Sequence, residues 1–132
     1  MVNEELSPYE RLGGEAAVRK LVDRFYELMA TLPQAQEIRD MHPVDLSGSA
    51  DKLFKFLSGW LGGPQLYVEE YGHPRLRMRH MHVPIDEAAR DAWMLCMKKA
   101  LEEMNIEDEM LTKHLLHSLF KTADFMRNQE ES

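Results

Sequence analysis

Apolar side chains recur at helical intervals along most of this chain. Counted from Val18, the apolar positions follow steps of 3, 4, 7, 8 and 11, and counted from Ala89 they follow steps of 4, 7, 8, 11 and 15. This spacing is typical of helices that bury one face. The two stripes are Val18, Leu21, Val22, Phe25, Tyr26 and Met29, and Ala89, Trp93, Cys96, Met97, Ala100 and Met104. No segment shows the period of two that a strand requires, so the predicted fold class is all-α.

Capping residues, glycines and prolines predict where these helices begin and end. Ser7-Pro8 begins a short helix that Gly13-Gly14 ends, and Ser47 or Ser49 caps another that runs to about Leu61. The remaining predicted helices are 34–41, a short piece over 74–80, one capped by Asp86, and one over about 107–128 with Met110, Leu111, Leu115, Leu119, Ala123 and Met126 on its apolar face. Residues 62–73, which hold three glycines and Pro64, are predicted to form an irregular loop.

Length and charge restrict the class of protein. The 132 residues predict a single domain over 1–132, with about 1–7 and 129–132 loosely ordered. The net charge of −7 disfavours nucleic-acid binding, which needs a basic face. One cysteine excludes a disulfide framework, and neither a signal peptide nor a run of about 18 apolar residues is present. We therefore expect a cytoplasmic protein with no membrane partner.

His80 and Trp93 stand out as candidates for a binding site. A short helical piece ends at His80, Pro84 breaks the chain, and Trp93 lies on the apolar face of the next helix. Both side chains can thus face one cavity from different walls. A neutral imidazole at an apolar cavity is a candidate ligand for a metal or for heme iron. Taken alone, the same pattern also fits a satisfied core or surface histidine.

Other residues admit ordinary structural interpretations. Tyr26 could be a core tyrosine bonded to a backbone carbonyl, and His42, before Pro43, a residue of a surface turn. His80 and His82 with His73 could suggest zinc, but a closed zinc site usually has four ligands. His114 and His117 share one helix face, which is more typical of a solvated surface. Phosphate loops, catalytic elbows and the CxxCH motif of covalent heme are absent.

Taken together, these residues resemble the truncated hemoglobins of group II, which are heme proteins with a two-over-two helical sandwich. The resemblance extends from about Tyr9 to Asn128. Its most specific part is the sequence Gly-His-Pro-Arg-Leu-Arg-Met-Arg-His over 72–80, followed by Pro84, Asp91-Ala92-Trp93 and Cys96-Met97. The glycines at 13–14 and 62–63 fall where that family has its helix-ending motifs.

The resemblance implies a set of site residues around a bound heme b. It implies that His80 is the proximal ligand of the iron and that Arg79 binds a heme propionate. The residues expected to contact the cofactor are Leu53, Phe56, Leu57, Tyr67, Leu76, Arg79, His80 and Trp93. The residues expected on the distal side, where a gas ligand binds, are Tyr26, His42, Ser49, Leu53 and Trp93. Tyr26, His42 and Trp93 are expected to supply hydrogen-bond donors to a bound oxygen molecule, which carries partial negative charge.

Several functions remain open at this stage. The first is a heme protein that binds oxygen, nitric oxide and carbon monoxide at a five-coordinate iron. The second is a redox enzyme that turns over nitric oxide or peroxide at the same heme, with electrons from an unidentified reductase. A third is a heme-free four-helix interaction module. The sequence leaves open whether the protein is an enzyme and whether it is a monomer or a homodimer.

Overall fold

The computed structural model describes residues 6–81 and 83–128, with the side chains of Arg77 and Arg79 left out. Within these residues every regular element is helical, as predicted, and there is no strand. The helices are α1 (Pro8–Leu12), α2 (Glu15–Thr31), a 3₁₀ turn η1 (Pro33–Ala35), α3 (Gln36–Asp40), α4 (Ser47–Trp60), α5 (Leu66–Tyr71), α6 (Leu76–Arg79), α7 (Glu87–Glu103) and α8 (Glu109–Phe125).

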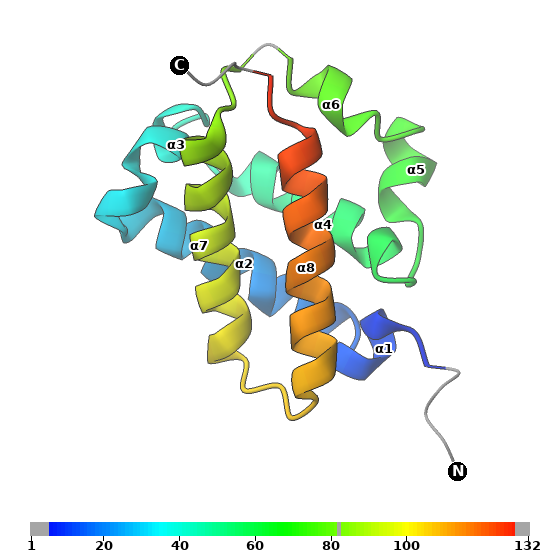
Figure 1. The fold of residues 1–132 in the computed structure, drawn as a ribbon. Coiled ribbons are helices and arrows are strands. Elements are labelled where there is room, and N and C mark those ends of the chain that lie inside the picture. Colours follow the sequence, from blue (N-terminus) through cyan, green and yellow to red (C-terminus); the bar gives the residue numbers. More distant parts are fainter. Residues whose placement is uncertain (1–5, 82, 129–132) are drawn as a thin grey trace.

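Four long helices form two stacked pairs. Helices α7 and α8 run side by side at the front of Figure 1, and α2 and α4 lie behind them. Helix α2 packs against both α7 and α4, so it joins the two layers. The predicted two-over-two helical sandwich is therefore confirmed. The short helices α5 and α6 lie together at one side of the molecule, and α3 lies at the opposite side.

The core forms where the predicted apolar stripes meet. Phe25 and Cys96 are both fully buried, and all six residues of the α2 stripe are buried. Trp93 is only half-buried, although it lies on the α7 stripe. The assignment of Met110 to the buried face of α8 is wrong, because this side chain is 74% exposed. Met110 lies in the first turn of α8, and the buried face of this helix begins at the next residue, Leu111.

The predicted caps are confirmed for two helices and wrong for one. The Ser7 hydroxyl accepts the Glu10 N–H, and the Asp86 carboxylate accepts the Ala89 N–H at 2.8 Å. Helix α4 has no side-chain cap of this kind, and Ser47 is instead its first helical residue. The Ser47 N–H donates to the Asp45 carboxylate at 2.9 Å. An aspartate side chain, rather than a serine hydroxyl, therefore accepts a backbone N–H at the start of α4.

The predicted irregular loop over 62–73 is wrong, because it contains α5. This six-residue helix is too short to be stable alone, so tertiary contacts must hold it. The ring of Tyr67, which is 9% exposed, packs edge-to-face on Phe56 of α4 with 6.3 Å between ring centroids. Gly72 then ends the helix with a φ of 81°, a conformation that suits glycine.

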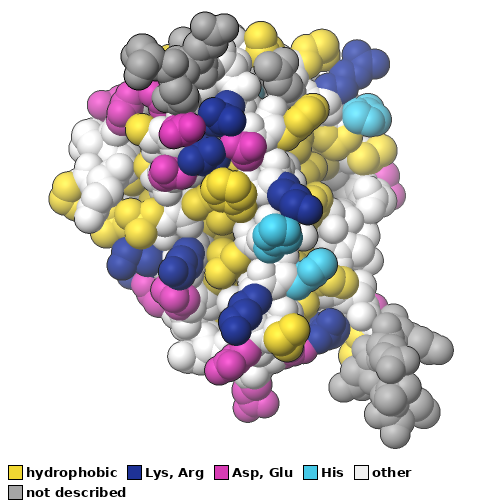
Figure 2. All heavy atoms as spheres, viewed as in Figure 1, with side chains coloured by type: hydrophobic (Ala, Val, Ile, Leu, Met, Phe, Trp, Pro, Cys, Tyr) yellow, Lys and Arg dark blue, Asp and Glu magenta, His cyan; other side chains and the backbone are white. Residues whose placement is uncertain are grey.

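The surface over α7 and α8 carries charges of both signs. Figure 2 shows basic and acidic side chains interspersed there, with apolar side chains between them. This face therefore lacks the single-sign basic stripe that nucleic-acid binding requires. Across the described part of the chain, no helix is long and apolar enough to cross a membrane.

Candidate functional site

The local structure around His80 fixes the orientation and the tautomer of its ring. His80 directly follows α6, and its Nδ1 lies 2.7 Å from the carbonyl oxygen of Leu76. A carbonyl only accepts hydrogen bonds, so Nδ1 must carry the proton and donate it. In the neutral imidazole this leaves the lone pair on Nε2 free for a metal ion. A second nitrogen fixed by an acceptor is the usual arrangement of a metal-binding histidine.

Two candidate donors on the predicted distal side share one buried neighbour. Phe25 contacts Tyr26 edge-to-face, with 4.9 Å between ring centroids, and contacts Trp93 of α7 at 5.1 Å. The structure thus brings α2 and α7 together at these three aromatic rings. The indole N–H of Trp93 donates to none of the residues the structure describes, and it is the one polar group of a half-buried ring.

The hydroxyl of Tyr26 has a weak partner. It donates to the backbone carbonyl of Ser49 on α4 at 3.5 Å, near the long limit for a hydrogen bond. A backbone carbonyl is the partner that the core-tyrosine interpretation predicted, but this contact leaves the hydroxyl able to serve a better-placed acceptor. Burial raises the pKa of Tyr26 well above its ordinary range, so the phenol stays protonated and can donate.

His42 lies next to Tyr26 but is oriented as an acceptor. Its Nδ1 lies 2.8 Å from the carbonyl of Ile38, so Nδ1 donates there and the neutral ring keeps a lone pair on Nε2. The rings of His42 and Tyr26 meet edge-to-face with 5.8 Å between centroids. Nε2 of the neutral ring can accept a hydrogen bond from Tyr26 or from a water, but the ring has no second N–H to donate. In this tautomer, Tyr26 and Trp93 remain as candidate distal donors.

Helices α4, α5 and α6 contribute the apolar residues expected at the cofactor. Leu57 is buried in the core, whereas Leu53 and Phe56 are only partly buried and pack against it. Tyr67 lies on Phe56, and Leu76 is half-buried on α6. Partly exposed apolar side chains on a well-packed core suit a flat apolar group that would cover them. The donor set and the lining therefore fit heme. The side chain of Arg79 lies outside the described residues.

Comparison with known proteins decides the family. A sequence model of the family described as bacterial-like globin matches residues 7–128. A group 2 truncated hemoglobin named YjbI, from Bacillus subtilis strain 168, is 43% identical over 126 residues, which cover 96% of this chain and 92% of that protein. This chain belongs to the group II truncated hemoglobins. The family resemblance of the sequence is thereby confirmed.

Solved structures of other truncated hemoglobins have the same fold. The group II two-on-two hemoglobin of the plant pathogen Agrobacterium tumefaciens is 48% identical, with a TM-score of 0.92 over 98% of this chain and all of that one. A truncated haemoglobin from Bacillus subtilis, described as oxygen-avid, is 43% identical, with a TM-score of 0.83 over 92% of this chain and 99% of the other.

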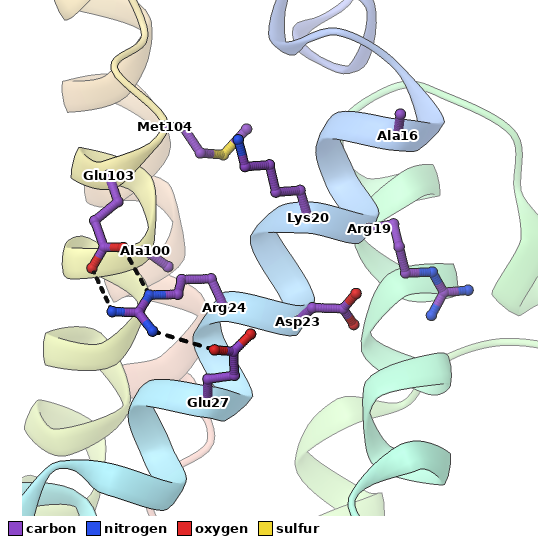
Figure 3. Close-up of a pocket in the computed structure, with 9 residues that line it drawn as sticks. All are labelled: Ala16, Arg19, Lys20, Asp23, Arg24, Glu27, Ala100, Glu103 and Met104. Atoms are coloured by element: carbon purple, nitrogen blue, oxygen red, sulfur yellow. Dashed lines mark hydrogen bonds and ion pairs between the residues drawn. The ribbon is translucent and has the colours of Figure 1, made fainter.

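A groove elsewhere on this truncated hemoglobin does not suit heme. Its volume is about 560 Å³, and it lies between α2 and the end of α7 (Figure 3). Arg24 crosses it to Glu103, with Nε 2.7 Å from the carboxylate, and a second nitrogen approaches Glu27 at 3.4 Å. Lys20, Asp23 and Arg19 add further charges. Such a lining of paired charges would be costly to cover with an apolar ring system, and none of the predicted site residues lies there.

The alternative metal sites gain no support from the described residues. Among them, no group of three or more histidine, cysteine or acidic side chains could hold a metal ion. His73 is exposed and its Nδ1 accepts the Arg75 N–H at 3.2 Å, and His82 of the zinc alternative lies outside the described residues. His114 and His117 are both exposed on α8, as expected of a solvated face.

Two residues at the site gained no role from the sequence. The apolar stripe of α2 predicts Phe25 as an ordinary core residue, although its ring contacts both Tyr26 and Trp93. Asn128 follows the last helix, and its side chain donates to the backbone carbonyl of His80 at 3.2 Å. A single asparagine 48 residues from His80 offers no sequence signal for such a contact.

Proposed function

We propose that this protein binds one heme b through Nε2 of His80 and uses it to bind diatomic gases, oxygen first among them. The observation that carries the proposal is the 2.7 Å hydrogen bond from His80 Nδ1 to the Leu76 carbonyl, because it presents Nε2 as a free lone pair. Membership of the truncated hemoglobins supports the same cofactor, and the relative from Bacillus subtilis is itself described as oxygen-avid.

Heme held by His80 would supply a five-coordinate iron that binds oxygen, nitric oxide or carbon monoxide reversibly. In the proposal, Leu53, Phe56, Leu57, Tyr67 and Leu76 exclude water from the faces of the porphyrin. Excluding water matters because the hydrogen bonds inside the site then act in a low dielectric. Arg79 is proposed to meet a propionate, a role suggested by the family resemblance and by the match between guanidinium and carboxylate.

On the distal side, the chain would stabilise the gas ligand by hydrogen bonds. The Trp93 indole N–H is the main donor, because it has no competing partner among the described residues. Tyr26 is the second donor, shared with the Ser49 carbonyl. His42 accepts rather than donates, so its proposed role is to orient the Tyr26 hydroxyl or a water at the rim.

Gas binding is the function that the contacts favour over redox turnover. Two candidate donors, Tyr26 of α2 and Trp93 of α7, both contact Phe25, and a partially charged ligand needs such donors. Turnover of nitric oxide or peroxide would need electrons from a reductase, and no contact within the described part of the chain favours that activity.

The experiment is to reconstitute the purified protein with hemin and record its absorption spectrum. We expect a Soret band, a pyridine hemochromogen spectrum of heme b, and one heme per chain. His80→Gly should lose the heme at least tenfold faster, and added imidazole should restore retention by filling the vacated space. His73→Gly, at an exposed histidine of the same stretch, is the matched control and should keep its heme. Equal heme loss from both variants would refute the assignment of His80.

A further inference from the structure

The segment that carries His80 is held in place from the far end of the chain. Helix α6 has four residues, so it cannot fix a side chain at its end by its own stability. After it, the Val83 N–H donates to the His80 carbonyl at 3.1 Å, and α7 begins at Glu87. We call His80, Val83 and Ile85 the His80 turn. The position of His80 therefore depends on whatever holds this turn.

Asn128, just beyond α8, makes four hydrogen bonds to described residues of that turn. Its side-chain nitrogen donates to the carbonyl of Val83 at 2.8 Å and to that of His80 at 3.2 Å. Its side-chain oxygen accepts the Ile85 N–H at 2.9 Å, and its own N–H donates to the Ile85 carbonyl at 2.9 Å. Both donors and the acceptor of one amide side chain are thus spent on three backbone groups of the His80 segment.

Ion pairs hold the end of α8, which Asn128 follows, against α7. Asp124 accepts from Arg90 of α7 at 2.8 Å and from Arg127 at 2.7 Å. Arg127 also reaches Glu87 at 3.6 Å. The hydrogen bonds of Asn128 therefore fix the turn after α6 relative to the α7–α8 pair. His80 is held at two points, its ring by the Leu76 carbonyl and its backbone by Asn128.

We propose that Asn128 is the positioning residue for the proximal histidine, and that it sets the direction in which His80 presents Nε2. The proposal rests on the proposed role of His80 as the heme ligand. Without the amide, His80, Val83 and Ile85 lose their side-chain hydrogen bonds to the end of α8, and only the four-residue helix α6 then holds the ring. The imidazole then meets the iron in a range of orientations, and heme is lost about tenfold faster.

Three variants of the full chain separate positioning from general stability. Asn128→Ala removes every side-chain bond. Asn128→Asp keeps an acceptor for the Ile85 N–H but removes the donor to His80 and Val83, and it places a negative charge against their carbonyls. Arg127→Gln is the matched control, because it removes the contacts of Arg127 to Asp124 and Glu87 at the same end of α8 and keeps the Asn128 amide.

The readouts are amide hydrogen exchange at Ile85, the iron–histidine stretching band of the ferrous protein, and the rate of heme transfer to an acceptor apoprotein. We expect faster Ile85 exchange in Asn128→Ala alone, because Asn128→Asp retains that bond. In both Asn128 variants we expect a shifted or broadened stretching band and about tenfold faster heme transfer. Arg127→Gln should change neither the band nor the rate of heme transfer.

The proposal is overturned if Asn128→Ala keeps the parent's stretching band while its heme transfer matches that of Arg127→Gln. It is also overturned if Arg127→Gln reproduces all the effects, because the residue would then act only through the stability of α8. Failure of the proposed function would look different. The chain would bind no heme through His80, yet Ile85 exchange would still respond to Asn128→Ala.

Discussion

The two sides of the candidate heme site use the same hydrogen bond in different settings. His42 and His80 each donate Nδ1–H to the carbonyl four residues earlier, at 2.8 and 2.7 Å. On the proposed distal side, the ring of His42 contacts Tyr26, which lies on the long helix α2 and belongs to the core. On the proximal side, His80 follows a four-residue helix and depends on Asn128. The position of the His42 ring thus depends on packing in the core, whereas the position of the His80 ring depends on a few hydrogen bonds.

This difference has a consequence for tuning the protein. Moving Tyr26 or Trp93 would require moving Phe25, which is fully buried between them. Moving His80 would require only a change in a surface turn. We therefore expect substitutions in the distal wall to change stability and ligand binding together, and substitutions in the proximal turn to change heme retention while the fold stays intact.

The largest expected effect comes from Phe25→Ala, which tests whether the distal wall belongs to the core. Removing a fully buried phenylalanine should lower the free energy of unfolding by about 3 to 5 kcal/mol. Leu76→Ala, at a half-buried position of α6, should cost on the order of 1 kcal/mol. Urea unfolding of both variants at the same heme loading measures the contrast. Equal losses would show that the proximal wall is as integral to the core as the distal one.

The next effect is on oxygen release and concerns Trp93→Phe. The variant keeps an aromatic ring against Phe25 and deletes the indole donor. A hydrogen bond to a charged acceptor is worth about 1.5 to 3 kcal/mol, so oxygen should dissociate roughly ten to a hundred times faster. Carbon monoxide carries little charge, and its release should barely change. Stopped-flow replacement of each gas provides the rates, and an unchanged oxygen rate would leave Trp93 as a packing residue only.

Tyr26→Phe should have the smallest effect of the three. Its hydroxyl already spends part of its capacity on the Ser49 carbonyl, so its net contribution is about 0.5 to 1.5 kcal/mol, or about two- to tenfold in the oxygen release rate. Because burial raises the pKa of this phenol, it remains protonated above its ordinary value of about 10. The difference between parent and variant should therefore stay constant from about pH 6 to 10. A larger effect than that of Trp93→Phe would reverse the order of the two donors.

The long helices were predictable because periodicity records burial directly. The α2 stripe from Val18 to Met29 is buried as predicted, and Ser7 and Asp86 cap their helices because capping depends on neighbours within one turn. Short helices are different, since they owe their stability to contacts that a local pattern does not contain. This is why α5 was predicted as a loop, although Tyr67 anchors it on Phe56.

The candidate site was predictable in its residues but not in its hydrogen bonds. The family resemblance pointed to Tyr26, His42 and Trp93, and the structure places all three around Phe25 or Tyr26. The family resemblance did not indicate that the Nδ1–H of His42 donates to the Ile38 carbonyl. The tautomer of a histidine depends on where a nearby carbonyl lies in the folded structure, which a sequence pattern does not contain. The role of Asn128 was hidden for the same reason.

The chain's one thiol, Cys96, lies on α7 three residues beyond Trp93, and none of its surface is exposed. Burial also raises its pKa, so it forms the reactive thiolate less readily than a free cysteine. A thiol reagent can therefore label the native protein only during the moments when α7 separates from its neighbours. Labelling kinetics would count those openings with no engineered probe. Labelling of Cys96 thus reports the opening rate of α7, the helix that also carries Trp93, the proposed main donor to a bound gas.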